Sequence, residues 1–148
     1  MPDRDTIKRV RKDAQEGKSA STQAGEFVRE EIEHVRAGKH GARSAKQAIA
    51  IGLSKARRAG VKLAQPDPAK TSRQTVRKAK EDSAAASKPH QPARRRSRAT
   101  IAALQREGAE AASPEALSKQ ARTAASRRTK KGRSAAAKKA GKTRKRAK

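Results

Sequence analysis

The fold is decided by residues 24–60, which read AGEFVREEIEHVRAGKHGARSAKQAIAIGLSKARRAG. The first half of this stretch has apolar residues at helical spacing, which predicts a helix over about Thr22–Ala37 that ends at Gly38. The second half opens with the capping-box pattern Ser44-Ala45-Lys46-Gln47 and closes on Gly60, which fits the left-handed position after a helix. The stretch therefore predicts two helices joined by a short loop.

The inward faces of these two helices differ in the size of their side chains. The later helix presents mainly small residues there, namely Ala45, Ala48, Gly52, Ala56 and Ala59. Small side chains allow a neighbouring helix to come close, because interaxial distance depends on the residues at the contact. We expect Phe27 and Ile32 of the earlier helix to fill this surface.

One more helix is predicted before this pair, over about Asp3–Glu16. Acidic residues lie in its first turn, where they are favourable, and Ile7 and Val10 share one face. The sequence thus predicts an all-α fold in which residues 1–63 form a small head, either a helical hairpin or a three-helix unit. Cores of this size supply little stability, which leaves self-association of the head as an open alternative.

Charge is distributed very unevenly along the chain. Residues 1–37 hold eight Lys/Arg and eight acidic residues, so they carry no net charge. Residues 38–148 hold 32 Lys/Arg and six acidic residues, which accounts for the whole net charge of +26. A neutral, patterned head before a long cationic body is typical of a protein that binds a polyanion.

The second part of the chain, residues 64–148, contains few residues that could form a core. Its only large apolar side chains are Val76, Ile101, Leu104 and Leu117. We therefore expect a basic Ala/Lys/Arg-rich tail that is largely disordered. Its alanine-rich segments near 71–87, 94–107 and 114–128 are expected to form transient helices that become firmer on a polyanion.

Nucleic acid is the partner that the basic tail favours. Each Lys or Arg that neutralises a phosphate releases condensed counterions, and this makes binding strong and dependent on salt. Proteins that read single strands or RNA use exposed aromatic residues, whereas Phe27 is the only aromatic residue here and lies on a predicted core face. The composition therefore favours duplex DNA over RNA, contacted through its backbone with little sequence preference.

The candidate phosphate-binding residues fall into three groups of Lys and Arg. They are Lys39, Arg43, Lys46, Lys55, Arg57, Arg58 and Lys62 in the head, Arg94, Arg95, Arg96 and Arg98 in the middle of the tail, and Arg127, Arg128, Lys130, Lys131, Arg133, Lys138, Lys139, Lys142, Arg144, Lys145, Arg146 and Lys148 near its end.

The loop Gly38-Lys39-His40-Gly41 has two interpretations. Its glycines permit a tight turn between helices, which is the simpler explanation. Alternatively, a glycine-edged loop before a helix start can approach a phosphate with its backbone N–H groups. Either way, the loop leads to Arg43 and to the basic outer face of the following helix.

Catalytic and metal-binding patterns are weak. Glu31-Ile32-Glu33-His34 has a Glu-x-x-His spacing, but it lacks the second copy that di-metal bundles use, so we interpret it as a solvated helix face on which Glu30 and His34 pair. His40 and His90 stand alone on predicted loops, and no nucleophile elbow or phosphate-binding P-loop is present. We therefore expect no enzyme, no metal and no cofactor.

The chain lacks cysteine, which fits a reducing compartment. Its polar start and short apolar runs indicate no signal peptide or membrane span, so we expect a cytoplasmic protein without a membrane partner.

Residues 19–63 resemble an uncharacterised family of small basic bacterial proteins, whose members are sometimes labelled DNA-binding. The resemblance rests on STQAGEF at 21–27, GKHGARS at 38–44 and KQAIAIGLSKARRAG at 46–60. The Ala/Lys/Arg tail separately resembles the tails of bacterial histone H1-like proteins, which implies DNA compaction.

A sequence-tolerant, nucleoid-associated DNA-binding protein is therefore our leading hypothesis. One alternative is a protein-interaction module that docks a partner on the acidic face of the 22–37 helix or on the small-residue face of the next helix. Another alternative is association with RNA or the ribosome.

Overall fold

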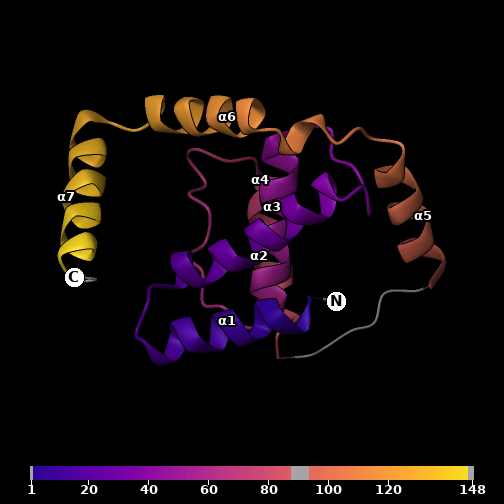
Figure 1. Cartoon of the computed structure of the whole chain (residues 1–148), viewed down its shortest axis with the longest axis horizontal. Coiled ribbons are helices and arrows are strands. Elements are labelled where there is room, and N and C mark those ends of the chain that lie inside the picture. The colour runs from indigo at the N-terminus through magenta and orange to yellow at the C-terminus, as the bar shows by residue number, and fades with distance from the viewer. Residues whose placement is uncertain (1, 88–93, 147–148) are drawn as a thin grey trace. The chain divides into compact units, whose positions relative to one another are not determined.

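A computed structural model describes residues 2–87 and 94–146 (Figure 1). The helices are α1 (Arg4–Gln15), α2 (Ala20–Arg36), α3 (Ala45–Arg58), α4 (Arg73–Ala84), α5 (Arg94–Gln105), α6 (Pro114–Ser126) and α7 (Lys130–Arg146), with a 3-10 turn, η1 (Glu110–Ala112). No strand occurs within the described ranges, so the predicted all-α fold is confirmed. Internal contacts group the chain into two compact units, Met1–Ser113 and Pro114–Lys148. None of the described helices is long and apolar enough to cross a lipid bilayer.

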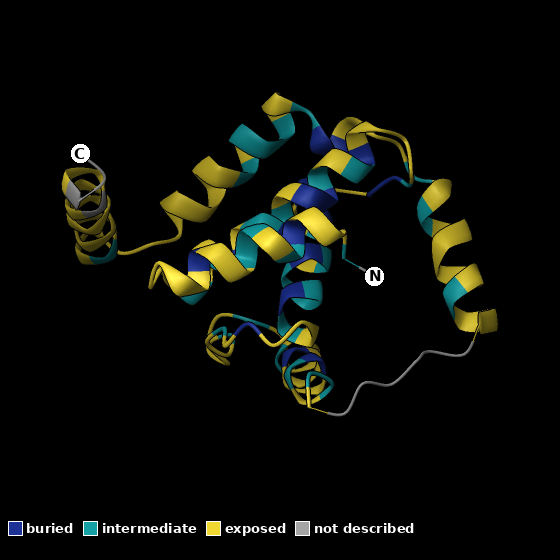
Figure 2. Ribbon diagram, turned by 60° about the horizontal axis from the view of Figure 1, so that its bottom comes forward, coloured by how far each residue is buried: buried dark blue, intermediate teal, exposed yellow. Residues whose placement is uncertain are grey.

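Helices α2 and α3 form the core of the first unit. Phe27 packs in one buried cluster with Ala56, and Val35 packs in a second cluster with Ala48, all four being fully buried. A Cβ placed on Gly52 would lie 2.6 Å from the Cα of Val28. The α3 backbone therefore approaches α2 more closely at this point than any side chain would permit, as the row of small residues predicts. Figure 2 shows the buried residues gathered on the packed helices of the first unit.

The helix ends agree with the sequence pattern except in two details. Helix α2 begins at Ala20, two residues before its predicted start. The Ser44 hydroxyl accepts a hydrogen bond from the Gln47 N–H at 3.2 Å, as a capping box requires. The Gln47 side-chain oxygen, however, accepts from the N–H of Arg43 at 2.9 Å, one residue earlier than in a standard box. Gly60 has a φ of +92°, the left-handed conformation predicted for it.

Helix α1 packs on α2 and completes a three-helix head. Ile7 and Val10 contact the buried cluster around Phe27. The Arg9 Nε donates to Glu26 Oε2 at 2.5 Å and ties the outer surfaces of the two helices together. Of the two head architectures left open by the sequence, the structure forms the three-helix unit.

Helix α4 packs against α3 through a buried carboxylate. Asp82 is only 4% exposed and accepts hydrogen bonds from the Ser54 hydroxyl and from Arg58 Nε, the latter at 2.9 Å. Burial by itself would raise the pKa of Asp82, but these hydrogen bonds and the positive charges of Arg58 and Lys78 lower it below its ordinary value. Asp82 therefore stays ionised and joins α4 to the head.

The segment after α5 also joins the head, and it does so mainly through its backbone. The Gly41 N–H donates to the Leu104 carbonyl at 2.9 Å, and the Ala42 N–H donates to the Gly108 carbonyl at 3.1 Å. Arg36 Nε donates to the Ala112 carbonyl at 2.8 Å, across 76 residues of sequence. Chain that sequence analysis assigned to the tail is thus held by the loop between α2 and α3.

Buried alanines complete this attachment. Ala111 and Ala112 pack with Val35, Ala42 and Ala48 in one buried cluster. A count of large apolar residues cannot detect such packing. Each alanine buries only a small surface, and backbone hydrogen bonds supply the remaining attachment of this segment to the head. The prediction of a largely disordered tail is therefore wrong for the described residues, and the first compact unit extends beyond the predicted head, to Ser113.

Replacing Gly41 by Ala is expected to detach this segment, because a Cβ on Gly41 would overlap the Glu107 carbonyl group. Overpacking of this kind costs about 1–3 kcal/mol. Hydrogen exchange measured by mass spectrometry should therefore become faster in peptides that cover residues 104–113. Gly108→Ala is the matched control, since a Cβ there meets nothing within 4 Å. Equal exchange in the Gly41→Ala variant and the unmodified chain would contradict this account of the docking.

The second unit consists of α6 and α7, and none of its described residues is buried. Alanine-rich sequence explains the helices, because alanine has the highest intrinsic helix propensity. Helices α4, α5 and α6 lie within the three ranges that the sequence marks as helix-forming, whereas α7 lies beyond them. The helices of this unit therefore present almost their whole surface to solvent.

Candidate nucleic-acid interface

Most of the predicted phosphate-binding residues are exposed. The exposed ones are Lys39, Arg43, Lys46, Arg58 and Lys62 in the first part of the chain, Arg94, Arg95, Arg96 and Arg98 on α5, and Arg127, Arg128, Lys130, Lys131, Arg133, Lys138, Lys139, Lys142, Arg144 and Lys145 in the second unit. Lys55 and Arg57 are only partly exposed. Arg146 belongs to α7, although its side chain is not described, and Lys148 lies outside the described residues.

Lys55 is held inside the head by two buried carboxylates. Its Nζ lies 2.6 Å from Glu31 Oε2 and 3.2 Å from Glu30 Oε1. Burial alone would lower the pKa of Lys55, but the hydrogen bonds and charges of Glu31 and Glu30 outweigh burial and raise it. Lys55 therefore neutralises internal charge, and this ammonium group is not available to a phosphate in this structure.

The two arginines at the end of α3 are also engaged within the chain. Arg58 is paired with Asp82 at 2.9 Å, although its side chain remains half exposed. Arg57 donates to the Ala64 carbonyl at 3.3 Å. These contacts hold α4 and the chain after α3 in place, so both residues have a structural role that their position on a basic helix face does not indicate.

The glycine-edged loop uses its N–H groups within the protein. The Gly38 N–H donates to Val35, and the Lys39 N–H donates to His34, both being carbonyl bonds that close the end of α2. The Gly41 N–H donates to Leu104, as described above. The structure therefore supports the turn interpretation of this loop over the phosphate-cradle interpretation. The Lys39 side chain, by contrast, remains exposed.

Helix α5 presents arginine on several sides. Arg94, Arg95, Arg96 and Arg98 are all exposed, and no residue of α5 is buried. The side chain of Ile101, next to them on the helix, is also 51% exposed. This helix therefore offers a dense cationic surface that no described acidic residue neutralises by an ion pair within 4 Å.

The second unit concentrates the positive charge further. Residues 114–146 contain thirteen Lys/Arg and one acidic residue, Glu115. On α7 nine of the seventeen residues are Lys or Arg. At 100° per residue they cover about two thirds of the helix circumference. A surface of this kind can meet phosphates from several directions.

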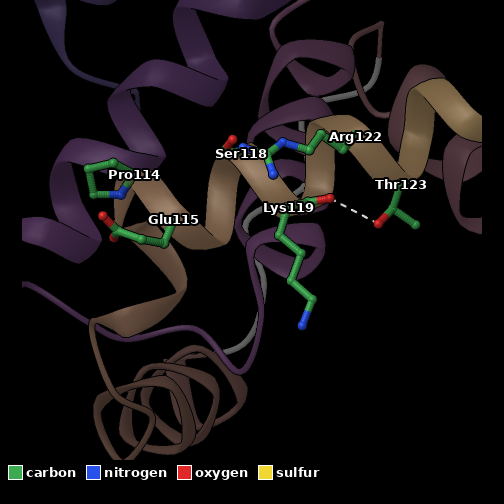
Figure 3. Close-up of a pocket in the computed structure, with 6 residues that line it drawn as sticks. All are labelled: Pro114, Glu115, Ser118, Lys119, Arg122 and Thr123. Atoms are coloured by element: carbon green, nitrogen blue, oxygen red, sulfur yellow. Dashed lines mark hydrogen bonds between the residues drawn. The ribbon is translucent and has the colours of Figure 1, made fainter.

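Sequence analysis missed two basic residues on α6. Lys119 and Arg122 are exposed, and they line a pocket together with Pro114, Glu115, Ser118 and Thr123 (Figure 3). Their spacing of three residues places them on neighbouring positions of one helix face. That spacing, combined with the absence of acidic residues after Glu115, is the signal that could have found them.

The comparisons with known proteins concern only the head. Residues 12–66 match a family of unknown function, DUF6496. The DUF6496 match covers about a third of the chain, including α2, α3 and the loop between them. It supports the expected likeness to an uncharacterised family, but the family's description contains no function and so does not support the DNA-binding label. No curated protein and no solved structure matches the chain.

The extent of the DUF6496 match separates two kinds of residue. The buried residues Phe27, Val35 and Gly52 and the pair of Lys55 with Glu31 all lie inside it. The exposed arginines of α5 and the cationic helices of the second unit lie outside it. The matched region therefore covers most of the packed head, and the most basic surfaces lie outside it.

Proposed function

We propose that this protein binds nucleic acid through its backbone phosphates, with duplex DNA preferred over RNA and with little sequence preference, and that it acts in the nucleoid. The observation that carries the proposal is the second unit, in which thirteen Lys/Arg stand against one acidic residue and no described side chain is buried. Like charges at this density repel one another and gain free energy when phosphates neutralise them.

The position of Phe27 supports backbone contact over base stacking. Phe27 is the only Phe, Tyr or Trp in the chain and is fully buried. Single-strand binders and RNA-recognition sheets stack bases on exposed aromatic rings. This protein has no aromatic ring to offer in the folded head, so we infer contact with phosphate and sugar, which contains no direct sequence information.

The structure bears on the two surfaces on which the alternative of a protein-interaction module was based, and it favours that alternative less than the binding of nucleic acid. On the acidic face of α2, Glu30 is buried against Lys55, and Glu26 and Glu33 form ion pairs with Arg9 and Arg29. The small-residue face of α3 is covered by α2. Association with RNA stays as an outcome of the test below.

Binding of the full chain to several fluorescent duplexes of equal length tests the proposal. We expect DNA duplexes of unrelated sequence to bind with similar affinity, an RNA duplex to bind more weakly, and log K to fall steeply and linearly with log salt. Tighter binding to the RNA duplex than to the DNA duplexes would favour the alternative of RNA association. Absence of binding in dilute buffer, or an affinity that salt does not change, would reject it.

A further inference from the structure

A cluster of charged and imidazole side chains lies inside the head. Glu31 and His34 lie one turn apart on α2, and His40 reaches them from the following loop. One ligand atom from each of the three lies within 4.8 Å of the others. Their side chains are only 1%, 13% and 15% exposed, respectively. The sequence predicts a solvated pair of Glu30 with His34 and an isolated His40, whereas in the structure both imidazoles are largely buried and lie beside Glu31.

The hydrogen bond at His40 Nδ1 limits the role that the other ring nitrogen, Nε2, can have. His40 Nδ1 lies 3.1 Å from the Gly41 carbonyl oxygen, which can only accept, so Nδ1 must carry the proton. In the neutral imidazole Nε2 is then an acceptor, and it faces Glu31 Oε1 at 3.1 Å. Such a contact is satisfied either by a second proton on Nε2, which makes an ion pair with Glu31, or by a metal ion that binds both atoms. An Nδ1–H bonded to a backbone carbonyl is also the arrangement that orients metal-binding histidines.

The charges around the contact between His40 and Glu31 also favour a bound cation. Asp3, Glu30 and Glu31 place three carboxylates around His34. Among the described residues, Lys55 is the one ammonium group that pairs directly with any of them, at Glu30 and Glu31. Lys55 occupies Oε2 of Glu31, which leaves Oε1 toward His40. The exposed Lys39 adds only long-range attraction, toward Asp3. The carboxylates of the cluster therefore outnumber its directly paired ammonium groups by two.

We propose that Glu31, His34 and His40 bind one divalent transition-metal ion, with Zn²⁺ as the best fit. Two imidazoles and one carboxylate are a ligand set typical of zinc sites with an open fourth position. At bond lengths of about 2.1 Å, tetrahedral ligand atoms lie about 3.4 Å apart, close to the 3.1 Å between His40 and Glu31. Such an ion would link the α2–α3 loop, which also holds residues 104–108, to α2.

A neighbouring group of ligands is less suitable. Asp3, Glu30 and His34 also come within 4.8 Å of one another, and they share His34 with the proposed site. This group has one imidazole in place of two, and the Asp3 side chain is 54% exposed. Borderline metals such as Zn²⁺ favour imidazole over a second carboxylate, so the ion belongs with His40. Asp3 Oδ2 lies 3.0 Å from His34 Nε2 and can orient this ring.

Titration of the full chain with Zn²⁺ near neutral pH, followed by calorimetry, tests the site. We expect one ion per chain, a rise in the unfolding temperature measured by circular dichroism, and a visible absorption band when Co²⁺ replaces Zn²⁺. His40→Gln and His34→Gln should each weaken Zn²⁺ binding by at least about 10-fold. His90→Gln removes the third histidine of the chain and is the matched control, with unchanged affinity expected.

A measurement on the unmodified chain covers the case in which a variant does not fold. Diethylpyrocarbonate modifies accessible imidazoles, and mass spectrometry locates the modified residues. We expect Zn²⁺ to slow the modification of His34 and His40 relative to the metal-free chain. Absence of binding for Zn²⁺ and Co²⁺ alike would overturn the proposal. Binding that survives both His34→Gln and His40→Gln in folded protein would overturn it as well.

Discussion

Replacing the nine Lys and Arg residues of α7 by Gln is expected to weaken binding to duplex DNA by about 10³-fold or more at low salt. The nine are Lys130, Lys131, Arg133, Lys138, Lys139, Lys142, Arg144, Lys145 and Arg146. Each phosphate contact contributes about −0.9 to the slope of log K against log salt, so losing nine would remove about 8 from the magnitude of the slope if all nine bind phosphate. Fluorescence anisotropy over a range of salt concentrations measures both quantities.

The Gln variant removes the positive charge of α7 and keeps its helical structure. Gln has nearly the helix propensity of Lys and Arg, so α7 should keep its helicity in circular dichroism. A matched control replaces every Lys of α7 by Arg and keeps the charge, and we expect it to retain the salt slope. If the Gln variant binds DNA with the affinity and slope of the unmodified chain, α7 has no part in binding and the second unit cannot carry the proposed function.

Replacing Gly52 by Ala should destabilise the head by about 2–3 kcal/mol. The new Cβ would lie 2.6 Å from Val28 Cα and 2.9 Å from Val28 N. Backbone atoms cannot rotate away as a flexible side chain can, so α2 and α3 must separate and their buried clusters must loosen. For a unit of this size, such a loss lowers the unfolding temperature by about 10 °C or more.

A second glycine provides the control for this effect. Gly25 lies in α2, and a Cβ there meets nothing within 4 Å. Gly25→Ala should therefore stabilise the protein by about 0.5–1 kcal/mol, the usual gain from Gly to Ala within a helix. Circular dichroism at 222 nm is the suitable measurement, because the chain has no Trp or Tyr. A Gly52→Ala variant as stable as the unmodified chain would contradict the close packing of α2 on α3.

Polar residues show where sequence reasoning fails in this protein. Lys55 lies on a basic helix next to Arg57 and Arg58, and nothing in this pattern distinguishes it from them. Only the packing of α2 on α3 brings it to Glu30 and Glu31. Helical spacing likewise placed Glu30 on a solvated face, whereas it is 2% exposed. Periodicity indicates which residues share a face, but it cannot indicate which elements will cover that face.

The sequence alone determined the local features of this protein: the places of helices α1 to α6, the left-handed glycine at position 60 and the concentration of positive charge after residue 37. Each depends on interactions between neighbours along the chain, which composition and spacing record directly. Only the tertiary structure decided that α4 and residues 104–112 join the head and that Glu31, His34 and His40 meet. These outcomes rest on alanine packing, backbone hydrogen bonds and charge pairs between distant segments, whose partners are set by three-dimensional packing.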